Sequence, residues 1–235
     1  CMAELFGRAT GTSKGKGGSM HIFDAAKRFM GGHAIVAGQL PLAAGLALAQ
    51  QYEGTDGLTI CFFGDGSTNQ GLYHETMNLA AIWKLPVLFF LENNMYGMGS
   101  SIERVRAGGI DFYPGMATYG IPAAEVDGMD VLAVRELTEA AVSRIRSGEG
   151  PQFIEAKTFR FVGHSLADGQ KYRGQEEVGE WEQRDPLSTF PLMLINQGIA
   201  TPSQIEKIEA EVDNQVKEAV QFAEQSPEPD PTEIA

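Results

Sequence analysis

Two predicted strand ends carry the residues whose types and spacing could do chemistry. An apolar run at residues 58–63 leads into a Gly-Asp-Gly-Ser turn at residues 64–67, and a second apolar strand ends at Asn94. Because ligands collect beyond the carboxyl ends of parallel strands, we expect the side chains of Asp65 and Asn94 to point into one crevice. A carboxylate and an amide oxygen suit Mg²⁺, which keeps the rest of its octahedral shell for water and phosphate. The pair therefore predicts a metal site.

The turn itself is suited to phosphate. The glycines on either side of Asp65 leave space that a Cβ would obstruct, and the amides of Gly66 and Ser67 are free at the start of a helix predicted for residues 70–83. A Gly-Asp-Gly run alone would be an ordinary surface turn, since Gly and Asp dominate turns. Here a second oxygen ligand ends the next apolar strand, and this combination favours a seat for a diphosphate bridged by the metal.

The composition excludes several classes of protein. The chain has 235 residues, 43% of them hydrophobic, which is enough for one globular α/β domain. No apolar stretch is long enough to span a membrane, and the first residues show no basic segment followed by an apolar core. The net charge of −13 argues against nucleic acid as a partner. The cysteines, Cys1 and Cys61, predict no disulfide framework and a reducing compartment.

The hydrophobic pattern predicts a doubly wound α/β fold with a mostly parallel sheet. Strands and helices alternate after a glycine-rich loop at residues 7–19, and residues 97–120 are expected to form an irregular loop over the site. The helix at residues 41–52 is apolar or small on all sides, which predicts that it is buried. The expected elements are helices at 1–6, 41–52, 70–83 and 131–146, and strands at 58–63, up to 94, at 125–128 and, with alternating polarity, at 152–161.

The chain is expected to have three parts. Residues 1–200 form the α/β domain, 201–226 an amphipathic C-terminal helix packed on it, and 227–235 a proline-rich tail. Within the domain, glycines punctuate residues 162–174 and no apolar periodicity docks them, which predicts a loop that is mobile until a ligand orders it.

Seven short motifs are spread over the chain: Lys16–His21, Gly38–Pro41, Gly64–Gly66, Trp83–Pro86, Glu92–Met98, Val126–Asp130 and Gly163–Ser165. Together they resemble the α subunit of the pyruvate dehydrogenase component of 2-oxo acid dehydrogenase complexes, over nearly the whole chain. Residues 23–24 and 33–38 resemble the cyanobacterial and plastid branch more than the mitochondrial one, which implies the bacterial cytoplasm or the plastid stroma. Family members also carry an N-terminal segment with a Tyr-Arg pair on the cofactor diphosphate, and we expect that segment to be missing from this chain.

The resemblance implies thiamine diphosphate and Mg²⁺ as cofactors and assigns residues to them. Asp65, the Asn94 side chain and the Tyr96 carbonyl would hold Mg²⁺. His164 falls where the family places a catalytic histidine, and Ser165 matches a serine that is phosphorylated in mitochondrial relatives. The implied cofactor-binding residues are Ala34, Val36, Gly64, Asp65, Gly66, Ser67, Asn94, Tyr96 and Met98.

The implied activity is the oxidative decarboxylation of pyruvate, with transfer of the acetyl group to the lipoyl domain of the acyltransferase component. The family works as an α2β2 heterotetramer whose β subunit supplies the glutamate that activates the cofactor, so the chain alone is expected to be inactive. Two alternatives stay open. One is the same chemistry on acetoin or branched-chain 2-oxo acids, because the motifs are partly shared. The other is a non-catalytic interaction subunit that keeps the fold and binds no cofactor.

Overall fold

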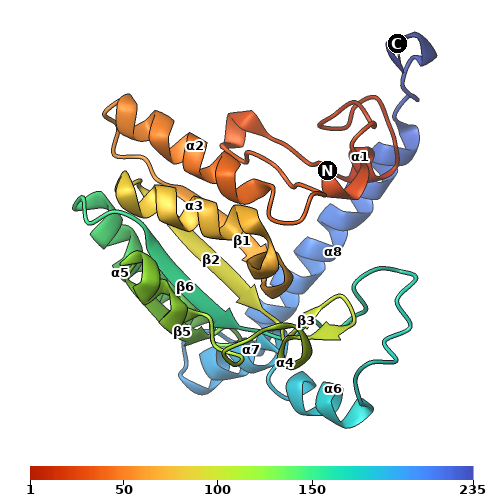
Figure 1. Cartoon of the computed structure of the whole chain (residues 1–235). Coiled ribbons are helices and arrows are strands. Elements are labelled where there is room, and N and C mark those ends of the chain that lie inside the picture. The colour runs from red at the N-terminus through yellow and green to blue at the C-terminus, as the bar shows by residue number, and fades with distance from the viewer. Residues whose placement is uncertain (235) are drawn as a thin grey trace. The chain divides into compact units, whose positions relative to one another are not determined.

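The computed structural model describes residues 1–234 of the chain (Figure 1). The chain divides into two compact units. Val36–Leu192 holds the sheet and most of the predicted site, and the two ends of the chain, Cys1–Ile35 and Met193–Ala235, form the other unit. Between residues 1 and 234, no helix combines the length and the apolar character needed to cross a membrane.

A four-stranded parallel sheet is the framework of the larger unit. Its strands are β1 (Thr59–Gly64), β2 (Val87–Asn93), β5 (Ala123–Asp127) and β6 (Gln152–Lys157). They lie in the order β1-β2-β6-β5, and every neighbouring pair is parallel, as the sequence predicts. Gly64 lies opposite Glu92 in the register. The residues that follow β1 therefore leave the sheet at the same edge as those that follow β2.

Helices cover both faces of this sheet, which confirms the predicted doubly wound fold. The helices along this part of the chain are α2 (Gln39–Tyr52), α3 (Gly71–Ile82), α4 (Ile102–Val105), α5 (Val131–Arg146), α6 (Gln175–Glu182) and α7 (Pro186–Asn196). Figure 1 shows α2 and α3 on one side of the strands and α5 on the other. Within β2, Phe89 and Leu91 pack in the core with α2 and α3, whereas Leu88 and Phe90 pack in the core with α5. This alternation follows from the two-residue period of a strand.

Two expectations about burial are wrong. The strand expected to alternate over residues 152–161 is shorter, Gln152–Lys157, and is buried on both faces because it lies inside the sheet between β2 and β5. The helix expected to be buried on all sides is α2, and it exposes Leu42, Leu48 and Tyr52 at 52%, 41% and 92%. An outer layer of a three-layer fold buries only the face turned toward the sheet, so small residues around a helix do not by themselves place it inside.

Several short helices and strands of the structure were not predicted from the sequence. Residues 97–120, expected to be irregular, contain α4 and a 3₁₀ segment at Tyr113–Tyr119, and a hairpin of β3 (Tyr96–Gly97) and β4 (Ser100–Ser101) begins just before them. Neither α6 nor α7 is predicted. Pro191 lies inside α7, and a proline within an apolar pattern normally indicates a helix end.

In the unit formed by the chain ends, one buried carboxylate organises the glycine-rich loop. Glu4, in α1 (Met2–Leu5), is fully buried and accepts hydrogen bonds from the backbone amides of Ser13, Gly15 and Gly17 at 2.8, 2.9 and 2.6 Å. Burial pushes the pKa of Glu4 upward, but the backbone amides outweigh it and leave the pKa below its ordinary value. The glycine-rich loop is thus held around the Glu4 carboxylate by hydrogen bonds from the backbone amides of the loop.

The helix expected at residues 201–226 is α8 (Pro202–Gln225). Its predicted apolar stripe is largely open to solvent: Ala223 is buried, whereas Ile208 and Val212 are about half exposed. The packing of this helix on the α/β domain stays a prediction.

Candidate cofactor site at the carboxyl edge of the sheet

Asp65 is the buried carboxylate of the site. Its exposed fraction is only 4%. Burial raises the pKa of the Asp65 carboxyl, while backbone amides of Asp65 and Asn94 and the charge of Arg160 pull it partly back. A carboxylate that loses solvation in this way is stabilised by a cation placed beside it. The environment of Asp65 therefore fits a metal ligand.

The residues after Asp65 form a tight turn with successive backbone amides. Residues 65–69 make a 3₁₀ turn in which the Thr68 hydroxyl donates to a backbone carbonyl at 2.8 Å. Gln70 is extended, with ψ of 142°, and separates this turn from α3. The amides of Gly66 and Ser67 therefore open the 3₁₀ turn and not the α-helix, which corrects the expected local structure. A turn of successive N–H groups still offers an anion a concave seat.

The two predicted strand ends meet at a pair of glycines. A Cβ built on Gly66 would lie 3.4 Å from the Cα of Gly97, so the two backbones are nearly in contact. A Cβ on Gly97 would lie 3.9 Å from Oδ2 of Asp65. Since Gly97 follows Asn94 by one short turn, the structure brings the turn after β1 and the turn after β2 together.

The turn after β2 presents oxygen atoms. The Asn94 side-chain oxygen accepts from the Tyr96 amide at 3.3 Å, and the Tyr96 carbonyl accepts from Nη1 of Arg160 at 3.2 Å. Met95, between them, has a φ of 68°, which is unusual for a residue other than glycine. An amide or carbonyl oxygen has two lone pairs, so both atoms retain capacity to bind a metal.

Arg160 is a residue of this site that the sequence analysis missed. Besides the Tyr96 carbonyl, its Nη2 donates to the Met98 carbonyl at 2.9 Å and to the Tyr172 hydroxyl at 2.8 Å. The guanidinium thus spans the turn after β2 and the loop that follows β6. A fixed positive charge close to the Asp65 turn suits an anionic diphosphate. The sequence signal that could have identified Arg160 is its position three residues after the end of β6.

His164 lies in a hydrogen-bonded loop beyond β6. Its backbone amide donates to Oδ2 of Asp168 at 2.8 Å, and the same oxygen accepts from the Tyr172 hydroxyl at 2.7 Å. These hydrogen bonds, first that of Tyr172 and then those of the His164 and Gln170 amides, lower the pKa of Asp168 to about 2. The Tyr172 hydroxyl also accepts a hydrogen bond from Arg160, so a continuous set of contacts joins the His164 backbone to the Tyr96 carbonyl. Mobility of this loop in the absence of cofactor stays a prediction.

The remaining cofactor residues implied by resemblance are less connected. Met98 is 62% exposed beside the site, and Val36 is 54% exposed just before α2. Ala34 falls in the unit formed by the chain ends. Contact of these three residues with a cofactor stays a prediction.

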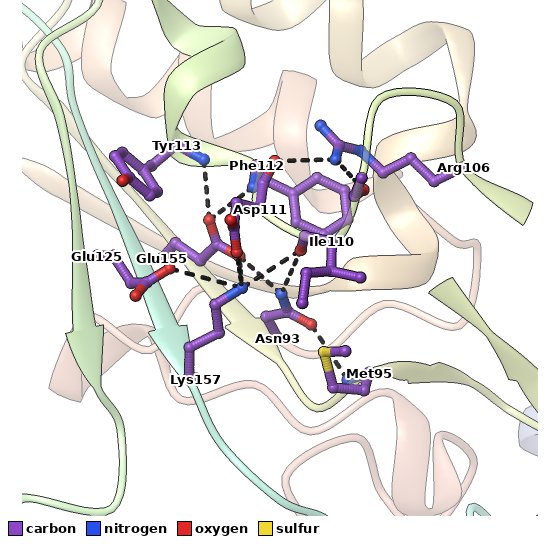
Figure 2. A network of polar contacts seen from close by, with 11 residues as sticks. Asn93, Met95, Arg106, Ile110, Asp111, Phe112, Tyr113, Glu125, Glu155 and Lys157 are labelled. Atoms are coloured by element: carbon purple, nitrogen blue, oxygen red, sulfur yellow. Dashed lines mark hydrogen bonds and ion pairs between the residues drawn. The ribbon is translucent and has the colours of Figure 1, made fainter. Parts of the chain in front are cut away.

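A cluster of three carboxylates beside Asn93 already contains an internal cation, Lys157. Asp111, Glu125 and Glu155 could together hold a metal, but the Lys157 ammonium lies 2.8, 3.6 and 2.7 Å from their oxygens (Figure 2). Burial lowers the pKa of Lys157, and the hydrogen bonds and charges of Asp111 and Glu155 outweigh it, so its pKa is raised. Lys157 therefore already lies among these carboxylates, and Asp65 stays the predicted metal ligand.

A parallel sheet with helices on both faces and a buried carboxylate beyond its carboxyl ends places the chain in the class of doubly wound α/β proteins, which bind ligands at this position. The family described as dehydrogenase E1 component matches residues 1–232. The chain belongs to this family. Its membership confirms the resemblance carried by the motifs, and with it the class of thiamine-diphosphate-dependent oxidoreductases.

Individual relatives agree. The chain is 46% identical over 234 residues to the pyruvate dehydrogenase E1 component subunit alpha of Rhizobium meliloti, covering 99% of this chain and 67% of that protein. It is 47% identical over 234 residues to the subunit of the same name from Zymomonas mobilis, covering 99% and 66%. It is 44% identical over 237 residues to the chloroplastic subunit alpha-3 of Oryza sativa, covering 97% and 56%. The chain thus spans 56–67% of the length of these relatives.

Proposed function

We propose that this chain acts within the α subunit of an enzyme that oxidatively decarboxylates pyruvate and passes the acetyl group to the lipoyl domain of an acyltransferase component. The observation that carries the proposal is the meeting of the Asp65 turn with the turn that holds Asn94 and Tyr96. The printed names of the relatives support pyruvate as the substrate. Bacterial and chloroplastic relatives support the bacterial cytoplasm or the plastid stroma as the compartment.

Each group of the site has a role in this reaction. Asp65, with the Asn94 side chain and the Tyr96 carbonyl, holds Mg²⁺, and the amides of residues 66–67 bind the diphosphate. Thiamine diphosphate, when bound, supplies the carbon nucleophile and the electron sink for decarboxylation. Arg160 keeps the Tyr96 turn in place and adds positive charge. His164 binds the carboxylate of the 2-oxo acid through an imidazole N–H and guides the incoming lipoyl group.

A β subunit completes the site in an α2β2 heterotetramer. The exposed apolar side chains of Leu42, Leu48 and Tyr52 on α2 support an assembly, because a contiguous apolar face is costly in water. Expressed without a β subunit, the chain should self-associate and show no decarboxylase activity. Light scattering and a turnover assay test this, and an active, monodisperse monomer would contradict the proposed assembly.

Substrate preference decides between the chemistries that share these motifs. In the α/β assembly containing this chain, turnover should be highest with pyruvate and at least about tenfold lower in kcat/KM with branched-chain 2-oxo acids or acetoin, since a methylene or hydroxyl changes pocket fit by about 1–3 kcal/mol. A preference for one of the other substrates would overturn the pyruvate assignment. Failure to bind thiamine diphosphate would instead favour a non-catalytic subunit.

A further inference from the structure

Glu155 is a fully buried carboxylate whose two oxygens are both occupied by hydrogen-bond donors (Figure 2). Oε1 accepts from Nδ2 of Asn93 at 2.6 Å and lies 2.7 Å from Nζ of Lys157. Oε2 accepts from the backbone amides of Phe112 and Tyr113 at 2.7 and 2.8 Å. The carboxylate is therefore held in one orientation from both sides.

This arrangement fixes which way the Asn93 amide points. Its Nδ2 faces two acceptors, Glu155 and the carbonyl of Ile110, the latter at 3.2 Å. Because nitrogen and oxygen of an amide lie on opposite sides, the Asn93 oxygen must face the other way, where it accepts from the Met95 amide at 3.1 Å. Asn93 has no exposed surface. By binding the Asn93 nitrogen, Glu155 thus turns the Asn93 oxygen toward the backbone after β2, where it accepts the Met95 amide.

That turn is the one that presents the proposed metal ligands. Met95 has a φ of 68°, a left-handed conformation that costs free energy for a residue with a Cβ. Two hydrogen bonds hold this conformation: the Met95 amide donates to Asn93, and the Met95 carbonyl accepts from the amide of Ile102 at 3.0 Å. On either side of Met95 lie the Asn94 side chain and the Tyr96 carbonyl. Loss of the Asn93 acceptor would loosen the backbone between these two ligands, while Arg160 still contacts the Tyr96 carbonyl.

We propose that Glu155 is a positioning residue for the metal-binding turn, acting through Asn93 on Met95. The proposal rests on the proposed function, since it takes the Asn94 and Tyr96 oxygens as Mg²⁺ ligands. Glu155 touches neither metal nor substrate. Its role is to keep one amide side chain oriented, so that the oxygen pair is in place before the cofactor arrives and binding need not order the turn.

The variant Glu155→Gln tests this with almost no change of volume. Every oxygen of Glu155 faces donors, so the NH₂ of a glutamine must meet donors in either orientation. Removing such a supporting contact typically lowers metal affinity by about 10–100-fold. We expect Mg²⁺-dependent binding of thiamine diphosphate to the α/β assembly to weaken by about tenfold or more in calorimetry. In the cofactor-free protein, hydrogen exchange at the Met95 amide should become faster.

A compensating substitution separates positioning from general destabilisation. Asn93→Asp alone places two carboxylates against each other and should also weaken binding. When Asn93→Asp is combined with Glu155→Gln, the new carboxylate can accept from the new side-chain NH₂ and still accept from the Met95 amide. The new NH₂ still lies beside the Lys157 ammonium and the new carboxylate faces the Ile110 carbonyl, so this double variant should recover only part of the lost affinity, a non-additive result. The matched control Asp111→Asn removes another carboxylate partner of Lys157 that does not contact Asn93, and should leave affinity unchanged.

Three results would overturn the proposal: wild-type affinity in Glu155→Gln, unchanged exchange at Met95, or a double variant as weak as the two single changes combined. If Glu155→Gln does not fold, Asn93→Ala serves in its place, because it removes the bond to Met95 and leaves Glu155 on Lys157 and two amides. Unaltered affinity in Asn93→Ala would likewise refute positioning. Absence of cofactor binding in the wild-type assembly would contradict the proposed function itself.

Discussion

Asp65→Ala should abolish Mg²⁺-dependent binding of thiamine diphosphate to the α/β assembly. The Asp65 carboxylate is buried, and its raised pKa reflects a charge that lacks solvent and gains from a cation. Truncating one partner of a buried charge pair costs about 2–5 kcal/mol, which corresponds to a loss of about thirtyfold to several thousandfold in affinity. Asn94→Ala should weaken binding less, since a neutral oxygen contributes less to a divalent cation than a carboxylate does.

Calorimetry with thiamine diphosphate, with and without Mg²⁺, measures this effect. Asp127→Ala is a suitable control because it removes a carboxylate at the carboxyl end of β5, on the opposite side of the sheet from β1, where Asp127 pairs with Arg184 at 2.6 Å. Affinity should be unchanged in that variant. If Asp65→Ala bound the cofactor as tightly as wild type, the metal would have to be assigned elsewhere.

The elements that carry Asp65 and Asn94 could be predicted because their signals are local. β1 and β2 are continuous apolar runs, and α5 has an amphipathic period that ends in basic residues, so its bounds, Val131–Arg146, match the sequence analysis. Parallel order then places both strand ends at one edge without any knowledge of side-chain contacts.

The supporting contacts could not be predicted, because each joins residues far apart in sequence. Glu155 and Lys157 lie in a strand that was expected to alternate, and a polar residue in such a pattern is normally assigned to solvent. Their burial depends on Asn93 and on the chain near Asp111, which reach them only in the folded sheet. Arg160 is similar, since its partners on the Tyr96 turn are brought close by the pairing of β2 with β6.

Ser165→Glu should block turnover while leaving Mg²⁺ and thiamine diphosphate binding nearly unchanged. Ser165 is exposed next to His164, and its carbonyl accepts from the Asp168 amide at 3.0 Å in a tight turn. The turn has little spare room, because a Cβ on Gly163 would lie 2.7 Å from the Asp168 carbonyl. A carboxylate at residue 165 adds negative charge beside Asp168 and His164, where an anionic 2-oxo acid must enter.

The contacts that join this loop to the Tyr96 carbonyl run through Asp168, Tyr172 and Arg160 and do not include the Ser165 side chain, so the same change should leave the metal-binding turn intact. Affinity for the cofactor therefore separates effects on the loop from effects on the metal-binding turn. Steady-state rates with pyruvate and calorimetry on the same assembly give both quantities.

Ser165→Ala is the matched control: it removes the hydroxyl without adding charge and should retain most of the activity. Comparable loss in Ser165→Ala would point to the hydroxyl rather than repulsion. Full activity in Ser165→Glu would mean that substrate reaches the cofactor without passing this loop, and His164 would then lose its assigned role, because its backbone is held within the same turn by Asp168.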